Sequence, residues 1–206
     1  MKYRESIIEQ LKNQPYFTKE SFSQLASAYS LKDSTICSYL VRSVARKDII
    51  QLKRGVYVTS DFHLKHRNDT SYFFYLANIL RGPSYISSWT ALQYYNLATE
   101  TINTITSVTE KGTRNFTTKV GTFSYQSIAK KLFTGFNLEK SGFEFYIASP
   151  SKALFDLLYS KTNQFRGFSF ESLDGYVESL RIDIDEMENG EREKFNKMVK
   201  EYIHHE

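Results

Sequence analysis

The fold is decided by residues 18–58, whose sequence is TKESFSQLASAYSLKDSTICSYLVRSVARKDIIQLKRGVYV. Thr18 is typical of a helix N-cap, and the apolar residues that follow it at helical spacing predict a short helix ending near Ser30. After a turn, a further helix is predicted, with Asp33 or Ser34 as its N-cap. Its buried stripe consists of Ile36, Leu40 and Val44. Residues 18–58 therefore predict two helices joined by a turn.

A β-hairpin is predicted directly after these helices. Ile49–Leu52 and Val56–Val58 are rich in β-branched residues, and they flank the short segment Lys53–Gly55. Two cations at a hairpin tip can simply prevent edge-to-edge pairing of strands. Because this hairpin follows a helix-turn-helix, we favour its interpretation as the wing of a winged helix.

The exposed side of the later helix is predicted to be polar and basic. Its residues are Ser34, Thr35, Ser38, Tyr39, Arg42 and Arg46. Such side chains suit contacts with base edges and phosphates, whereas Lys53 and Arg54 at the hairpin suit a phosphate or the minor groove. These eight residues are the predicted DNA-binding site, and the alternative is an ordinary solvated surface.

Composition favours a globular cytoplasmic protein. The chain has 206 residues with 41% hydrophobic content, and its single cysteine, Cys37, fits a reducing compartment. No apolar run approaches the length of a membrane helix, and the first residues do not resemble a signal peptide. Residues 171–206 carry 11 Asp/Glu against 5 Lys/Arg, whereas residues 1–70 carry 7 against 12. The acidic segment indicates either a surface that avoids a polyanion or a solvated helix face.

The predicted fold class is α+β, with three parts along the chain. These are a winged helix-turn-helix over residues 1–60, a polar linker over 61–70, and a mixed α/β domain with an antiparallel or mixed sheet over 71–206. The expected helices of the last part are Tyr72–Leu80, Ser87 or Ser88 to Tyr95, Pro150–Tyr159 and one or two acidic helices at the end. The expected strands are Ile102–Val108, Phe116–Val120, Thr122–Tyr125 and Phe143–Ile147.

Further cations occur beyond the predicted linker. They are Lys111, Arg114, Lys119, Lys130 and Lys131. They are possible extensions of a basic DNA-binding surface, and the alternative is that they are solvated loop charges.

Catalytic and cofactor signals are weak. Ser149-Pro-Ser-Lys152 fits the S-x-x-K pattern of serine–lysine enzymes, but no Ser-Asp-Asn or Lys-Thr-Gly partner accompanies it. Ser149 is better explained as the N-cap before Pro150, and Lys152 with Asp156 forms an ordinary i, i+4 pair. No phosphate-loop, dinucleotide or zinc pattern is present. We therefore predict no catalytic residue, no cofactor and no metal.

Four strings in order resemble the AbiEi antitoxins. They are LKRGVYV at 52–58, PSYISSWTAL at 83–92, TSVTEKGTRNFTT at 106–118 and IASPSKALFDLLY at 147–159. Each is weak alone, but their order and spacing over about residues 5–180 make the resemblance fairly specific. The acidic C-terminal segment carries no pattern of this family.

The resemblance implies a winged-helix transcriptional repressor with an antitoxin domain, from a type IV toxin–antitoxin system of abortive phage infection. It implies double-stranded DNA as a partner, through inverted repeats in the chain's own promoter. It also implies a nucleotidyltransferase-like toxin of the AbiEii type, countered without a stable complex. Dimerisation or cooperative binding on DNA would fit a repeated site. The alternative hypotheses are a winged-helix regulator with an unrelated second-domain ligand or protein, and a Ser–Lys enzyme with an accessory winged helix.

Overall fold

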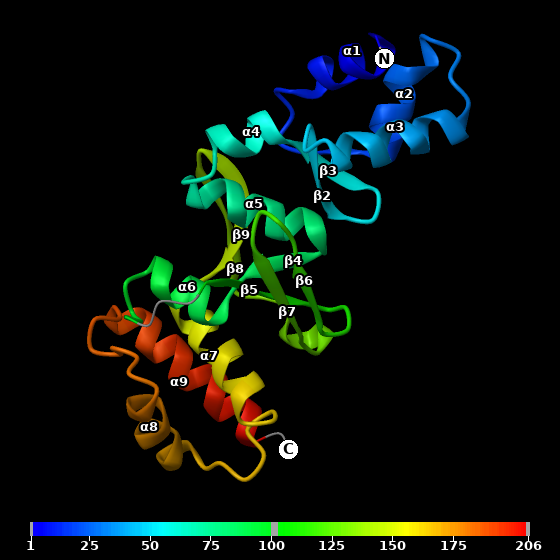
Figure 1. Cartoon of the computed structure of the whole chain (residues 1–206). Coiled ribbons are helices and arrows are strands. Elements are labelled where there is room, and N and C mark those ends of the chain that lie inside the picture. The colour runs from blue at the N-terminus through cyan, green and yellow to red at the C-terminus, as the bar shows by residue number, and fades with distance from the viewer. Residues whose placement is uncertain (1, 100–102, 205–206) are drawn as a thin grey trace. The chain divides into compact units, whose positions relative to one another are not determined.

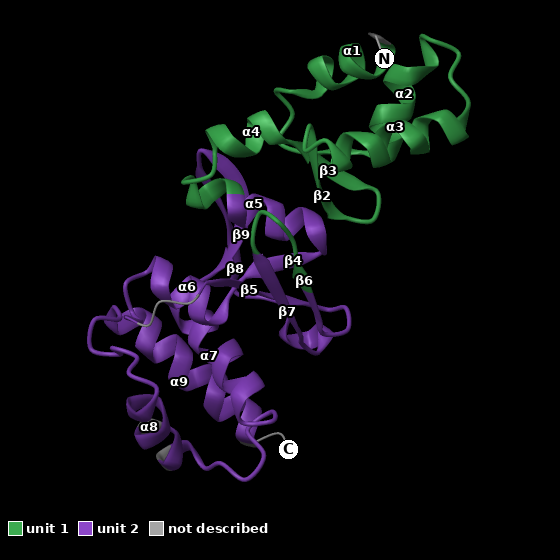
Figure 2. Cartoon of the chain, viewed as in Figure 1, with its two compact units in different colours: residues 1–72, 116–121 green, residues 73–115, 122–206 purple. Residues whose placement is uncertain are grey.

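The computed structural model of the chain describes residues 2–99 and 103–204. The chain divides into two compact units, residues 1–72 with 116–121 and residues 73–115 with 122–206 (Figure 2). Each unit is described by itself below. Within the described residues, no helix combines the length and the apolar character needed to cross a membrane.

In the described residues of the first unit, helices α1 to α4 surround a small antiparallel sheet (Figure 1). Its elements are α1 Lys2–Leu11, β1 Phe17–Thr18, α2 Lys19–Ser27, α3 Asp33–Ala45, β2 Ile49–Lys53, β3 Val56–Thr59 and α4 Ser60–Lys65. β3 is the middle strand, paired antiparallel with β1 on one side and β2 on the other. The predicted hairpin is thereby confirmed, with one irregularity in register between Gln51 and Lys53.

The helices of the first unit enclose one apolar core. Ile7, Phe17, Phe22, Ile36, Leu40 and Ile49 are all buried in it. The expected stripe of α3 therefore faces inward, although its last member, Val44, is only half-buried. At the start of α2, Thr18 accepts a hydrogen bond from the backbone N–H of Ser21, as the N-cap prediction required.

Two details of the first unit differ from the sequence-based expectation. α3 begins at Asp33 after Lys32, which occupies the N-cap position without a side-chain cap, so neither Asp33 nor Ser34 caps this helix. The segment expected as a linker contains α4, capped by Thr59. Phe62 of α4 is buried and packs on the rings of His66 and Tyr72 at 4.4 and 5.4 Å, so burial of an aromatic ring orders this segment.

The second unit is built on a mixed six-stranded sheet. Its strands are β4 Ser84–Ile86, β5 Thr104–Thr109, β6 Arg114–Thr117, β7 Thr122–Ser127, β8 Phe136–Ser141 and β9 Phe143–Ala148, in the order β6-β7-β5-β4-β9-β8. β4–β5 and β8–β9 are antiparallel, whereas β5–β7 and β4–β9 are parallel. The expectation of a mixed sheet in an α+β chain is confirmed. β4 and β8 were not expected, β6 begins two residues early, and Ile102 lies outside the described residues.

Helices cover both faces of this sheet. They are α5 Thr70–Leu80, which crosses the boundary between units, α6 Ser88–Tyr94 and α7 Pro150–Lys161. α9 Asn189–His204 packs on α7, and α8 Phe170–Ser179 packs on α9. Tyr125 donates its hydroxyl to Ala77 in α5 at 2.6 Å, whereas Tyr85 donates to Asp156 in α7 at 3.0 Å. The strand register places Tyr85 and Tyr125 on opposite faces, so α5 and α7 lie on opposite sides (Figure 1).

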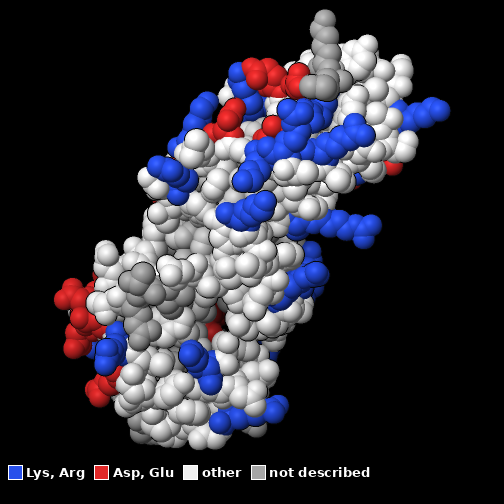
Figure 3. Space-filling model, in the orientation of Figure 1, with Lys and Arg blue, Asp and Glu red and all other residues white. Residues whose placement is uncertain are grey.

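The acidic C-terminal segment is a packed element of the second unit. Phe195, Val199 and Tyr202 of α9 are buried, and the Tyr202 ring lies 6.0 Å from that of Phe155 in α7. The many Asp and Glu residues lie mostly on the solvent side of this segment, and Figure 3 shows acidic side chains gathered over it. These charges are therefore mostly solvated, but Asp183, Asp185, Glu186 and Glu188 lie in the loop between α8 and α9 and not on a helix face.

α7 contains a buried ion pair whose carboxylate also binds residues in and directly after β4. Lys152 and Asp156 have side chains that are 2% and 0% exposed, and their charged groups contact each other directly. Asp156 also accepts hydrogen bonds from Tyr85 at 3.0 Å and from Ser87 at 2.7 Å. Burial raises the pKa of Asp156 in spite of these donors. The i, i+4 pair predicted from the sequence is therefore present, but helical spacing gave no sign that it is buried.

We predict that Asp156→Ala destabilises the second unit by about 3–5 kcal/mol, because it leaves the Lys152 ammonium buried without its counter-charge. Denaturant unfolding followed by the fluorescence of Trp89, the single tryptophan, measures the loss in this unit. Glu144→Ala is the matched control, since it removes the exposed ion pair with Lys140 and is expected to cost about 0–1 kcal/mol. An equal decrease in the free energy of unfolding in the two variants would contradict the prediction that the buried pair matters more than the exposed one.

Candidate nucleic-acid interface

The solvent-facing side of α3 carries most of the predicted DNA-binding residues. Ser34, Ser38 and Arg42 are exposed and lie at spacings of four residues, so they form one row along the helix. Ser38 donates its hydroxyl to the carbonyl of Ser34 at 2.9 Å. The row therefore presents short hydroxyl side chains at the start of α3 and a guanidinium near its end.

The other predicted residues of α3 are less available. Thr35 is half-buried, and Tyr39 is partly buried with its ring packed against the core of the unit. Arg46 follows the last residue of α3 and is exposed, but its Nε lies 3.7 Å from the Asp48 carboxylate. Asp33 adds an exposed carboxylate at the first residue of α3. The exposed polar face of α3 therefore contains fewer fully available side chains than the sequence predicted.

The hairpin tip, defined as Lys53–Gly55, is a tight turn. Only Arg54 and Gly55 separate β2 from β3, and Gly55 has φ +78°, a conformation that favours glycine. Arg54 is exposed and Lys53 is half-buried. The turn therefore projects the Arg54 guanidinium into solvent.

Lys19 links the hairpin tip to the starts of α2 and α3. Its backbone N–H donates to the carbonyl of Gly55 at 3.0 Å, and its ammonium lies 2.8 Å from Asp33. The hydrogen bond from Lys19 lowers the pKa of the Asp33 carboxyl. Lys19 was not among the residues predicted from the sequence, because its position beside an N-cap gives no sign of a contact with residues 33 and 55.

Two arginines of this surface carry charges that no carboxylate neutralises. In the described part of the chain, neither Arg42 nor Arg54 forms an ion pair. Figure 3 shows several Lys and Arg side chains on the first unit. Guanidinium groups bind phosphate or the edge of guanine with two parallel hydrogen bonds, so both residues are chemically suited to DNA.

The additional cations are divided between the units, with Lys119 in the first and the other four in the second. Lys111 and Arg114 follow β5, and Lys130 and Lys131 lie in the short helix η1 Lys130–Leu132 that follows β7. Because β5 and β7 are parallel, the segments that follow them begin at the same end of these two strands. Lys131 also stacks over the ring of Tyr202 at 5.7 Å.

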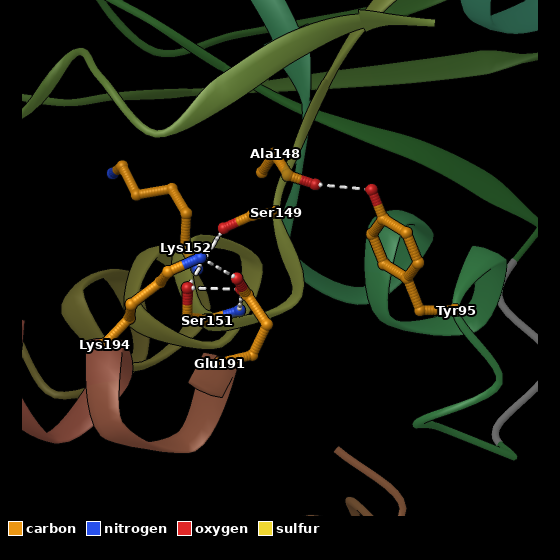
Figure 4. Close-up of polar contacts among 7 residues, drawn as sticks. All are labelled: Tyr95, Ala148, Ser149, Ser151, Lys152, Glu191 and Lys194. Atoms are coloured by element: carbon orange, nitrogen blue, oxygen red, sulfur yellow. Dashed lines mark hydrogen bonds and ion pairs between the residues drawn. The ribbon is translucent and has the colours of Figure 1, made fainter. Parts of the chain in front are cut away.

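The Ser–Lys alternative meets a different arrangement of side chains. Ser149 is the N-cap of α7 and accepts from the backbone N–H of Lys152 at 3.4 Å. The Lys152 side chain extends away from Ser149 (Figure 4), and its ammonium pairs with Asp156. A Ser149–Lys152 dyad would require both residues to exchange their partners.

A carboxylate from α9 occupies the N-terminus of α7. Glu191 accepts from the backbone N–H of Ser151 at 3.0 Å, from the Ser151 hydroxyl at 2.7 Å and from Lys194 at 2.6 Å (Figure 4). Burial acts to raise the pKa of Glu191, but the hydrogen bonds from Lys194 and Ser151 outweigh it and lower the value to about 2. Glu191 therefore fastens α9 to α7.

Comparison with known proteins adds no family to this picture. A scan against protein-family models and a search of curated proteins both find no match for the chain. Across residues 2–99 and 103–204, no group of three or more His, Cys, Asp or Glu side chains could hold a metal ion.

We predict that Glu191→Gln destabilises the second unit by about 1–2 kcal/mol at pH 7, less than its full pKa shift implies because part of the group is solvated. The folded-state pKa is lower than the unfolded value, so the wild-type advantage is complete above about pH 5. It is lost as the pH falls from about 4.5 to about 2. Urea unfolding of both proteins at several pH values tests this. Glu193→Gln, at an exposed position of α9, is the control; a difference between wild type and Glu191→Gln that does not change with pH would contradict the prediction.

Proposed function

We propose that the first unit is a winged-helix DNA-binding domain and that the chain represses its own promoter by binding inverted repeats there. α3 would enter the major groove, and the hairpin tip would contact phosphate or the minor groove beside it. The residues that would contact DNA directly are Ser34, Ser38, Arg42 and Arg54.

One observation carries this proposal: two unneutralised arginines, Arg42 and Arg54, lie on the two parts of one unit that a winged helix uses to hold DNA. Lys19 contacts both the hairpin tip and the start of α3. This contact would keep the two parts in a fixed relation when a duplex binds. Preorganised contacts lower the entropic cost of binding.

The antitoxin half of the proposal rests on the sequence resemblance. The chain would counter a nucleotidyltransferase-like toxin of the AbiEii type without forming a stable complex with it. A reading frame for such a toxin should then overlap or adjoin this one. Co-expression of that neighbouring protein with this chain should relieve its toxicity, and undiminished toxicity would contradict this half alone.

A regulator with another second-domain partner is the alternative. The second unit has a sheet covered on both faces and a groove of about 540 Å³ lined by Ser149, Lys194 and Lys197 among others. A ligand of that unit which changes DNA affinity, together with the absence of a toxin gene nearby, would favour the alternative.

A mobility shift with the chain's own upstream DNA tests the DNA-binding half. We expect binding to this duplex to be at least about 1,000-fold tighter than to a scrambled duplex of equal length. This ratio is the lower end of the range of specific over non-specific affinity for DNA-binding regulators. Footprinting should protect two related half-sites. Equal affinity for both duplexes would refute autorepression.

Arg54→Ala should weaken binding to all duplexes and reduce the slope of log affinity against log salt by about one, because one phosphate contact is lost. A salt titration on the upstream and scrambled duplexes measures both effects. Lys161→Ala, an exposed cation at the end of α7, serves as the control and should leave the slope unchanged. The same slope in Arg54→Ala and wild type would refute the contact.

A further inference from the structure

Val41 stands on the outward face of α3 with 69% of its surface exposed. It lies three residues after Ser38 and four before Ala45, so these side chains are neighbours on the helix. Ser38 and Ala45 are both exposed and small. Val41 is therefore the bulkiest apolar group on this face.

The side chain of Val41 is not part of the apolar core of the unit. Ile36 and Leu40 of the same helix are 4% and 3% exposed and supply its core contacts. A β-branched residue also favours a helix less than alanine does. A single exposed valine is unremarkable on most surfaces. Here it lies beside Arg42 and between two hydroxyl-bearing residues and an alanine, on the face that the proposed function assigns to DNA.

Only one base offers an apolar group in the major groove. The C5-methyl of thymine projects there, and apolar side chains recognise it by direct contact. The small neighbours of Val41 would let the helix approach the base edges closely. The two γ-methyl groups of Val41 would then be the groups nearest to the bases. Serine hydroxyls can contact any base, so they do not supply this selectivity.

We propose that Val41 determines specificity by contacting the C5-methyl of one thymine in each half-site. This inference rests on the proposed DNA-binding function and names the base that the same surface recognises. Arg42, next to Val41 in sequence, would contact a phosphate or a guanine at an adjacent position.

Replacement of thymine by deoxyuridine tests the contact, because it removes the methyl group and leaves the Watson–Crick pairing intact. The probe is the shortest upstream duplex that footprinting shows to be bound, with each thymine replaced in turn. Wild-type protein should lose about fourfold in affinity at one thymine of each half-site, the effect of one buried methyl group. Val41→Ala should bind thymine and uracil duplexes equally at that position.

Two variants keep the test independent of folding. Val41→Ala changes an exposed helix position, so circular dichroism and thermal unfolding should match wild type, and Val41→Thr keeps the shape while replacing one methyl by a hydroxyl. Val41→Thr should show a reduced uracil effect.

Several outcomes would overturn the inference. Specific binding with no thymine sensitive to uracil would refute the role of Val41 and leave the proposed function intact. A uracil effect that persists in Val41→Ala would assign the methyl contact to another residue. Equal weakening of all duplexes by Val41→Ala would indicate a contact that does not depend on base sequence and would refute the methyl contact. Absence of any sequence preference would refute both the inference and the proposed function.

Discussion

Burial of strand β3 is the constraint on which the first unit depends. Val56, Tyr57, Val58 and Thr59 are all buried, and the strand has a hydrogen-bonded partner on each side. β3 is the middle strand of its sheet, so its backbone groups are paired on both sides and both of its faces are covered. β1 ends at Thr18, the cap of α2, and β2 ends at the hairpin tip. The position of Arg54 and the start of α2 therefore both follow from one buried strand.

The second unit has a different kind of constraint, a carboxylate that accepts from three donors away from water. Asp156 draws Lys152, Tyr85 and Ser87 together, and each donor would be costly to leave unpaired at its depth. Such a network adds little net stability compared with an apolar core of equal volume, but it is strongly destabilising when one member is removed. It thereby fixes how α7 lies on β4.

Local signals explain which parts of the structure could be predicted from the sequence. The cap at Thr18, the stripe of α3 and Gly55 in the hairpin are properties of neighbouring residues, and the structure confirms these elements. β4 has three residues and α4 six, so periodicity could not identify them. The burial of Asp156 and the contact of Lys19 with Gly55 depend on residues distant in sequence. Helical spacing places Val41 on the same face as Ser38 and Arg42, but a prediction based on polar side chains does not include it.

The distribution of charge bears on how the proposed interface would work. Residues 1–70 have a net charge of +5, yet Lys19 and Arg46 are engaged with Asp33 and Asp48. With Arg42 and Arg54 alone on phosphates, one chain would release counterions for about two contacts, a small salt slope that gives weak non-specific binding. Affinity for a promoter would then depend on two copies at a repeated site and on base contacts within each. If this surface binds DNA as proposed, its modest charge and short side chains would favour selectivity over general attraction to DNA.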